Sequence, residues 1–363
     1  MNEYINHFDY NERLSILIGE NGSGKSLHLN QISKNFIDRG YQSICIANCV
    51  FDKFELYSKN IKFLGARLGD KLPQHAILNV LTKLKDSSTG FIVSSILSDL
   101  GFEKIIGFEI KNKKYLNEMD NHNFTESYKH LKEITSYKNK HLLQNTEDVI
   151  WVEPYVHDTF SLKVNELLSS LNELSEKNAD ELSFSFYLKK DDILIPVNRA
   201  SSGEVQKLLT ILFIASHINF KSAIIIDEPE NSLHPKWQQN FISELEGYFG
   251  QYTPKIIIAT HSPLIVTEEN NHGKIYKSYR THMQEMNTRE LSLEAILWDS
   301  FGVITAKNKY LSTLLVSSFN ALKNKETTIF EVRNLFENLY EASKDERQKH
   351  IIKEYFNIIN KNI

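Results

Sequence analysis

Apolar residues follow two patterns along this chain: short runs typical of buried strands, and stripes at helical spacing. The runs are rich in β-branched residues and predict strands at residues 14–18, 42–50, 105–110, 149–152, 222–226 and 255–259. The stripes, with apolar residues three or four apart, predict helices at residues 29–37, 164–174, 205–213, 311–322, 332–340 and 351–359. Because one helix separates the first two strands, we expect a βαβ unit and an α/β fold whose sheet is mostly parallel.

The regular alternation of strands and helices is interrupted in the middle of the chain and near its end. Residues 54–181 mix short strand-like runs with polar stretches, and we interpret them as an inserted α/β lobe. Residues 291–363 carry only helical stripes and predict a C-terminal helical region. The predicted core is therefore discontinuous, over 1–53 and 182–290, and a hairpin at 184–197 leads the chain back into it.

The turn between the first strand and the first helix has the form G-x-x-x-x-G-K-[ST], which is typical of loops that bind nucleotide phosphates. Glycine allows a positive φ and lets backbone N–H groups face a phosphate, and the following helix adds the positive end of its dipole. Lys25 would reach the β- and γ-phosphates, and Ser26 would ligate Mg²⁺. Gly-rich turns also join strands to helices in many other folds, but the strand before and the helix after favour nucleotide binding. The predicted binding residues are Gly19, Asn21, Gly22, Ser23, Gly24, Lys25 and Ser26.

Two later strands end in residues that can take part in catalysis. Asp227 and Glu228 follow the apolar run 222–226, and burying unpaired charge in a core is expensive. We therefore place them at the C-terminal edge of the sheet, where α/β folds bind ligands. Asp227 suits the Mg²⁺ shell, and Glu228 suits a base that polarises the attacking water. His261 ends the strand at 255–259 and could hydrogen-bond the γ-phosphate, although a lone histidine is more often structural.

A small, hydroxyl-rich turn precedes the helix predicted at 205–213. It consists of Ser201, Ser202, Gly203 and Glu204. Such a turn at a helix N-terminus can form a second anion site. Taken alone, it is more typical of an ordinary N-cap made by Ser201 or Ser202.

The composition is that of an ordinary globular protein, with 41% hydrophobic and 24% charged residues. The net charge of −4 does not indicate a surface for nucleic acid, so DNA binding would require a local basic face. Cys45 and Cys49 have no nearby Cys/His partner set, which favours buried free thiols in a reducing compartment over metal ligands. The apolar stretch 90–100 is too short and too polar to span a bilayer, so we expect a soluble, cytoplasmic protein without a membrane partner.

The order of these motifs resembles that of the ABC class of ATPases. Residues 227–235 (Asp-Glu-Pro-Glu-Asn-Ser-Leu-His-Pro) and 260–263 (Thr-His-Ser-Pro) are similar to its non-transporter branch, which includes the RecF, SMC and OLD-like ATPases of bacterial defence systems. In that class residues 200–204 would be the signature turn. Residues 231–234 would be the D-loop, with His234 in place of the transporter Asp.

The resemblance is specific at residues 14–50 and 184–266 and says little about the rest of the chain. The sequence departs from the class pattern after the second strand, where it has no clear Q-loop glutamine. The two weak candidates for that position are Asp52 and Gln74. The N-terminal strands of the class are abbreviated. An aromatic side chain near Phe8 could stack on adenine there, although covering the sheet edge is the more frequent role.

The resemblance implies that two copies of the chain bind ATP and Mg²⁺ head to tail. Ser201 and Gly203 of one copy would close over ATP held by Lys25 and Ser26 of the other. ATP would then act as a dimerising switch, and hydrolysis by Glu228 would time its release. The class further implies that the ATPase regulates a separate effector, a nuclease or toxin, in anti-phage defence.

Three other functions fit parts of the pattern. A RecF-like DNA-repair ATPase would clamp DNA across the dimer. A transporter ATPase would need a membrane partner, and the long insert between the phosphate loop and the signature turn argues against it. A nucleotide sensor that does not hydrolyse ATP would keep binding without turnover.

Overall fold

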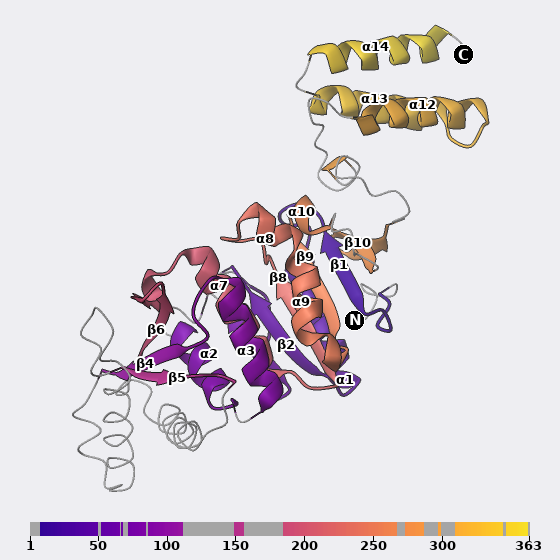
Figure 1. The fold of residues 1–363 in the computed structure, drawn as a ribbon. Helices are drawn as coiled ribbons and strands as arrows, with labels where there is room; N and C mark the ends of the chain where they lie inside the picture. The colour runs from indigo at the N-terminus through magenta and orange to yellow at the C-terminus, as the bar shows by residue number, and fades with distance from the viewer. Residues whose placement is uncertain are drawn as a thin grey trace, which may run out of the picture. The chain divides into compact units, whose positions relative to one another are not determined.

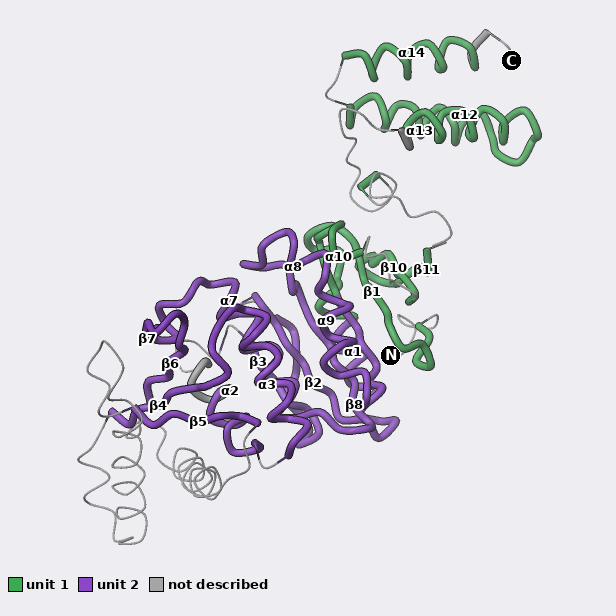
Figure 2. Tube along the Cα trace, in the orientation of Figure 1, with its two compact units in different colours: residues 1–28, 259–363 green, residues 29–258 purple. Residues whose placement is uncertain are grey.

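The structure is a computed structural model of the 363-residue chain. It describes residues 8–49, 52–65, 67, 72–84, 86–111, 149–155, 184–266, 273–286, 297–298, 309–343 and 346–361. The chain divides into two compact units, residues 29–258 and residues 1–28 with 259–363 (Figure 2).

The unit of residues 29–258 contains two sheets. Its strands are β2 (Gln42–Ala47), β3 (Ile61–Gly65), β4 (Ile106–Ile110), β5 (Ile150–Val152), β6 (Phe184–Lys190), β7 (Ile193–Pro196), β8 (Ser222–Asp227) and most of β9 (Lys255–Thr260). One sheet has the order β9-β8-β2-β3, and β2 pairs in parallel with both β3 and β8. The other sheet has the antiparallel order β5-β4-β6-β7.

Helices cover the parallel sheet of this unit because its strands are apolar on both faces. The helices are α1 (Lys25–Asp38), α2 (Leu72–Leu81), α3 (Ser87–Asp99), α7 (Ser202–His217), α8 (Pro235–Gln239) and α9 (Phe241–Phe249), with short 3₁₀ helices η3 (Val197–Arg199) and η4 (Gly250–Tyr252). The long helix α7 contacts β2 and β3, and α2 and α3 pack against α7 (Figure 1). β2 and β8 are fully apolar in their centres, as expected for strands of a covered parallel sheet.

The other unit holds the strands that flank the phosphate loop and a group of three C-terminal helices. Its elements are β1 (Leu14–Ile18), the end of β9, α10 (Pro263–Val266), β10 (Lys274–Tyr279), β11 (His282–Glu285), α12 (Lys309–Lys323), α13 (Ile329–Ala342) and α14 (Glu346–Lys361). The strand order is β11-β10-β1-β9. β1 pairs in parallel with β10, and β10 and β11 form an antiparallel hairpin. None of the helices that the structure describes in either unit is long and apolar enough to cross a membrane.

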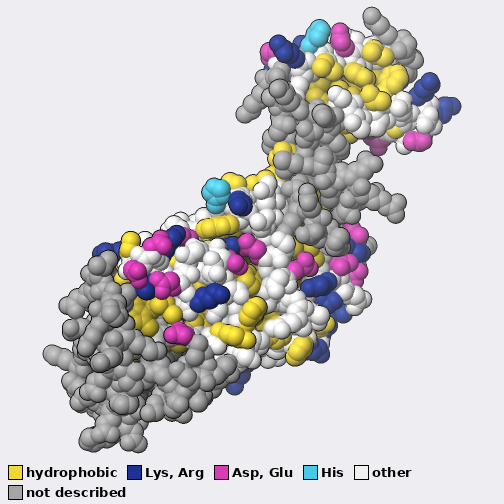
Figure 3. Space-filling model, viewed as in Figure 1, with side chains coloured by type: hydrophobic (Ala, Val, Ile, Leu, Met, Phe, Trp, Pro, Cys, Tyr) yellow, Lys and Arg dark blue, Asp and Glu magenta, His cyan; other side chains and the backbone are white. Residues whose placement is uncertain are grey.

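The C-terminal helices pack around their own apolar core, as their stripes predicted. The buried residues are Leu311, Leu315, Val332, Phe336, Leu339, Ile352 and Ile359. The third stripe was predicted too wide, because Ile351 and Ile358 are 42% exposed. Each precedes a buried isoleucine by one position, which turns it about 100° away from the core. Hydrophobic side chains are therefore visible on the surface of these helices (Figure 3).

The predicted strands and the 184–197 hairpin are confirmed, and the helix predicted at 164–174 lies outside the described residues. β3, α2 and α3 were not predicted. The division into core, insert and C-terminal region stays a prediction. The strand pairings cross its boundaries, because β3, within the predicted insert 54–181, pairs with β2 of the predicted core. Conversely, β6 and β7, within the predicted core segment 182–290, join the antiparallel sheet. Neither Cys45 nor Cys49 is in a disulfide. Cys45 is buried, and burial raises its pKa to about 12, whereas Cys49 is only half-buried.

Candidate functional site

The phosphate loop lies between β1 and α1, as the sequence predicted, and its lysine points back onto the loop. Lys25 is 5% exposed. Its Nζ donates to the carbonyl oxygens of Gly19, at 3.0 Å, and Glu20, at 3.1 Å. The loop is thus folded around a buried ammonium group.

The backbone of the loop has the conformation that a phosphate cradle needs. Gly22 and Gly24 have φ values of 78° and 94°, a region that a side chain makes costly. The Ser23 hydroxyl is buried and has no hydrogen-bond partner among the described residues. A phosphate, which presents several acceptor oxygens, fits a loop with a buried cation and an unused hydroxyl donor.

His261 lies directly beside Lys25. Its Nε2 is 2.7 Å from Lys25 Nζ. Nδ1 of the same ring is 3.4 Å from Lys25 Nζ, and because an ammonium group can only donate, the closer nitrogen, Nε2, is placed to accept. The structure therefore brings together two of the three predicted catalytic residues, within the unit that contains the phosphate loop.

The turn end of the β10–β11 hairpin is also bonded to this loop. Ser278 Oγ donates to the Ser23 carbonyl at 3.2 Å. His28, on α1, lies 2.8 Å from the same hydroxyl, and its Nδ1 donates to it. Burial, with a smaller effect of His282, lowers the pKa of His28 to about 4, so its ring is neutral near pH 7. These bonds connect the hairpin, the loop and α1.

Asp227 and Glu228 lie at the end of β8, in the unit of residues 29–258. Asp227 is fully buried, and its carbonyl accepts from the Asn48 backbone N–H at 3.1 Å. Glu228 has a φ of 54°, which is uncommon for a residue with a side chain. Asn231 Nδ2 donates to Glu228 Oε2 at 3.0 Å and to the Asn48 carbonyl at 3.3 Å. The carboxylate of Glu228 is therefore oriented by the loop that follows it.

Asn48, the polar residue that follows β2, was not among the predicted site residues. Asn48 contacts Asn231 and also accepts a hydrogen bond from Gln206, on α7. Asn48 is the first polar residue after a buried run, the same signal that identified Asp227, so it could have been found. The proposed Q-loop residue Asp52 binds the Phe54 N–H and pairs with Arg67 at 3.4 Å. The side chain of the other candidate, Gln74, lies outside the described residues.

The Ser-rich turn forms the N-cap of α7 by a reciprocal pair of hydrogen bonds. Ser201 Oγ accepts from the Glu204 N–H at 3.3 Å, and Glu204 Oε2 accepts from the Ser201 N–H at 3.0 Å. This capping box is the alternative that the sequence analysis rated above an anion site. Ser201 and Ser202 remain exposed.

Gly203 allows the loop after β8 to approach this turn. A Cβ on Gly203 would lie 2.6 Å from the Ser232 carbonyl oxygen, so a side chain there would force the backbone to shift. The turn and the loop line an open pocket, which consists of Ser201, Ser202, Gly203, Ser232, Leu233, His234, Lys236 and Trp237. The predicted signature turn and D-loop therefore share one surface.

The predicted metal ligands are Ser26 and Asp227. Groups of three or more His, Cys, Asp or Glu that could hold an ion are absent from the ranges that the structure describes. Mg²⁺ keeps several waters and takes few protein ligands in sites that also bind phosphates. Ser26 and Asp227 stay the predicted pair.

A protein-family model described as "AAA domain, putative AbiEii toxin, Type IV TA system" matches residues 84–267, which is 184 of the 363 residues. The chain belongs to this AAA-domain family. The matched segment includes the Ser-rich turn, Asp227, Glu228 and His261, and the phosphate loop lies before it. The family is thus of the non-transporter ABC/AAA type, as the resemblance predicted.

Two curated proteins are similar to about half of this chain. One is an uncharacterized protein of Methanocaldococcus jannaschii, 27% identical over 188 residues, which are 47% of this chain and 22% of that protein. The other is the retron Vc95 probable ATPase of Vibrio cholerae, 27% identical over 187 residues, 51% of this chain and 33% of that protein. The matches span between a fifth and a third of the length of these relatives.

Among solved structures, the Smc head domain of Pyrococcus furiosus aligns with 76% of this chain and 90% of that chain, at 10% identity. The TM-score is 0.33, so the likeness carries no argument about function.

Proposed function

We propose that the chain binds ATP with Mg²⁺ on residues 19–26 and hydrolyses it. The position of Lys25 carries this proposal: a buried ammonium, held by carbonyl groups of its own loop, is a cation placed for a phosphate. Family membership supports the choice of ATP.

We assign the remaining roles from the predicted site. Lys25 would stabilise charge on the β- and γ-phosphates, and Ser26 and Asp227 would ligate Mg²⁺. Glu228, oriented by Asn231, would polarise the attacking water, and His261 would contact the γ-phosphate. Bound ATP would take acceptor bonds of Lys25 that Gly19, Glu20 and His261 now hold.

Two copies of the chain would act together, each supplying its Ser201–Gly203 turn to ATP on the other. The open pocket shared by this turn and Ser232 supports an intermolecular role, because Ser202 and Ser232 are exposed residues beside a helix N-terminus. A regulatory role beside a separate nuclease or toxin, in anti-phage defence, is supported by the toxin–antitoxin description of the family and by the retron ATPase among the relatives.

Replacing Lys25 by Ala tests nucleotide binding. We expect ATP affinity, measured by calorimetry with Mg²⁺, to fall by at least about 100-fold, because a charge-assisted contact to phosphate is lost in a buried site. The control is Lys34→Ala, which removes from the same helix, outside the loop, a half-buried lysine that pairs with Glu55. Equal ATP affinity of the wild-type and Lys25→Ala proteins, with both folded, would refute the assignment of the loop.

A further inference from the structure

The turn that joins β10 and β11 carries a pair of aromatic rings. Tyr279 and His282 lie opposite each other in the hairpin, with ring centroids 4.8 Å apart and an interplanar angle of 14°. Both side chains are exposed, Tyr279 at 37%. A Cβ on Gly24 would lie 3.5 Å from Arg280 Cα and 3.7 Å from the Tyr279 carbonyl oxygen. The rings therefore belong to the turn that touches the phosphate loop.

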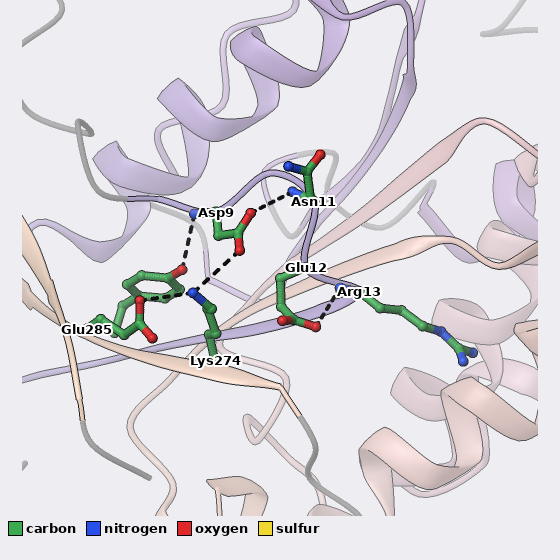
Figure 4. Close-up of polar contacts among 7 residues, drawn as sticks. Asp9, Asn11, Glu12, Arg13, Lys274 and Glu285 are labelled. Atoms are coloured by element: carbon green, nitrogen blue, oxygen red, sulfur yellow. Dashed lines mark hydrogen bonds and ion pairs between the residues drawn. The ribbon is translucent and has the colours of Figure 1, made fainter.

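This hairpin is held in place at both of its ends. At the turn, Ser278 is bonded to Ser23 and His28, as described above. At the other end, Lys274 pairs with Glu285 at 3.1 Å and with Asp9 at 3.4 Å (Figure 4). A ring pair on such a braced hairpin keeps its position relative to the loop.

Exposed apolar side chains gather near the loop. In the described part of residues 8–28 and 259–286, the large hydrophobic side chains that are exposed are Leu27, at 57%, and Tyr279. Leu27 follows Ser26 in the loop motif, and Tyr279 lies at the turn against Gly24. Two exposed apolar groups beside one phosphate cradle indicate a ligand with an apolar part next to its phosphates.

The aromatic residue of the N-terminal lead-in is not available for this role. Phe8 is 7% exposed, and its ring packs against those of Tyr276, at 5.2 Å, and Tyr10, at 4.8 Å. It therefore covers the sheet, the more frequent of the two roles considered for it. The aromatic surface beside the loop is instead in the second segment of this unit, at Tyr279 and His282.

We propose that the Tyr279–His282 pair stacks the base of a nucleotide whose phosphates bind residues 19–26. The inference rests on the proposed phosphate site and adds the base to it. Every base has a π face that can extend a two-ring stack, and a purine covers more of it than a pyrimidine. Leu27 supplies apolar contact, and Lys277, with Nζ 5.9 Å from the Tyr279 ring centroid, supplies a cation beside it. The ligand class is a purine nucleoside triphosphate.

A comparison of two ligands separates the base from the phosphates. Wild-type and Tyr279→Ala/His282→Ala proteins are titrated calorimetrically with ATP and with inorganic tripolyphosphate, in the presence of Mg²⁺. We expect ATP binding to weaken by about 10-fold or more, the usual loss of stacking on aromatic side chains, and tripolyphosphate binding to stay unchanged. Tyr279→Phe, which keeps the ring, should bind ATP like the wild type. Phe330→Ala, which removes an exposed aromatic from α13, is the matched control.

Each other outcome overturns the inference in a recognisable way. If the wild type binds ATP and tripolyphosphate equally well, the phosphate site stands and base stacking is wrong. If the double variant loses both ligands equally while its thermal unfolding is unchanged, the rings shape the loop and do not hold a base. If the wild type binds neither ligand, the proposed phosphate site itself fails.

Discussion

The phosphate loop and the Ser-rich turn have similar compositions, and each leads into a long helix, yet they are held in opposite ways. In the turn, Ser201 and Glu204 bind each other's backbone N–H groups, so the start of α7 is closed by its own side chains. In the loop, Lys25 Nζ donates hydrogen bonds to backbone carbonyls, and the glycines adopt positive φ. One arrangement is a self-contained cap, and the other is a cradle around a cation. The difference explains why Gly and Ser content alone does not identify an anion site.

The largest expected effect separates binding from chemistry. Glu228→Gln keeps the shape of the side chain and removes its basicity, so we expect ATP hydrolysis to fall by about 100-fold or more, with ATP affinity retained. Size-exclusion chromatography with light scattering should then show a long-lived dimer in ATP. Glu337→Gln, on an exposed site of α13, is the control. Normal hydrolysis by Glu228→Gln would show that another group acts as the base.

A smaller effect is expected where the Ser-rich turn meets the loop after β8. Gly203→Ala places a Cβ 2.6 Å from a backbone oxygen, so we expect a loss of about 1–3 kcal/mol in the free energy of unfolding by urea. Gly247→Ala is the matched control, because a Cβ there meets nothing within 4 Å. Within α9 it should gain about 0.5–1 kcal/mol. Equal stability of both variants would mean that the turn and the loop are not in close contact.

The smallest effects compare the two serines directly. Ser201→Ala removes the cap of α7 and should cost about 1 kcal/mol of unfolding free energy. Ser23→Ala removes a buried hydroxyl that has no partner among the described residues, so stability without nucleotide should change by less than about 0.5 kcal/mol. Urea unfolding of both variants measures the difference. A larger loss for Ser23→Ala than for Ser201→Ala would reverse the comparison.

A second capping box, at the start of α13, is a control that tests whether Ser201 has a role beyond capping α7. Thr328 and Glu331 form the same reciprocal bonds at the start of α13. If Thr328→Ala and Ser201→Ala lose similar stability but only Ser201→Ala abolishes the ATP-dependent dimer, the turn acts between copies. If dimer formation survives in both, Ser201 is a cap alone.

The sequence was most informative where one local rule decides the structure. The phosphate loop, the strand that ends at Asp227 and the capping residue Ser201 each follow from a few adjacent residues, and each is found where it was expected. Asn48 itself follows a buried run and could have been found, but its contacts with Gln206 and Asn231 join three segments far apart in the sequence, so no local pattern reveals those contacts. The same holds for the hairpin at Tyr279, whose position against Gly24 comes from the pairing of β10 with β1.

Ligand binding at the proposed site would be coupled to folding. The Lys25 ammonium is already out of bulk water and bonded within the fold before any nucleotide arrives, so the loop is organised in the free chain. An anion that binds this folded loop and not the unfolded chain would stabilise the fold, and the gain would appear as resistance to unfolding that rises with the logarithm of ligand concentration. Melting temperature in rising ATP would thus report on the loop even in a variant that cannot turn over.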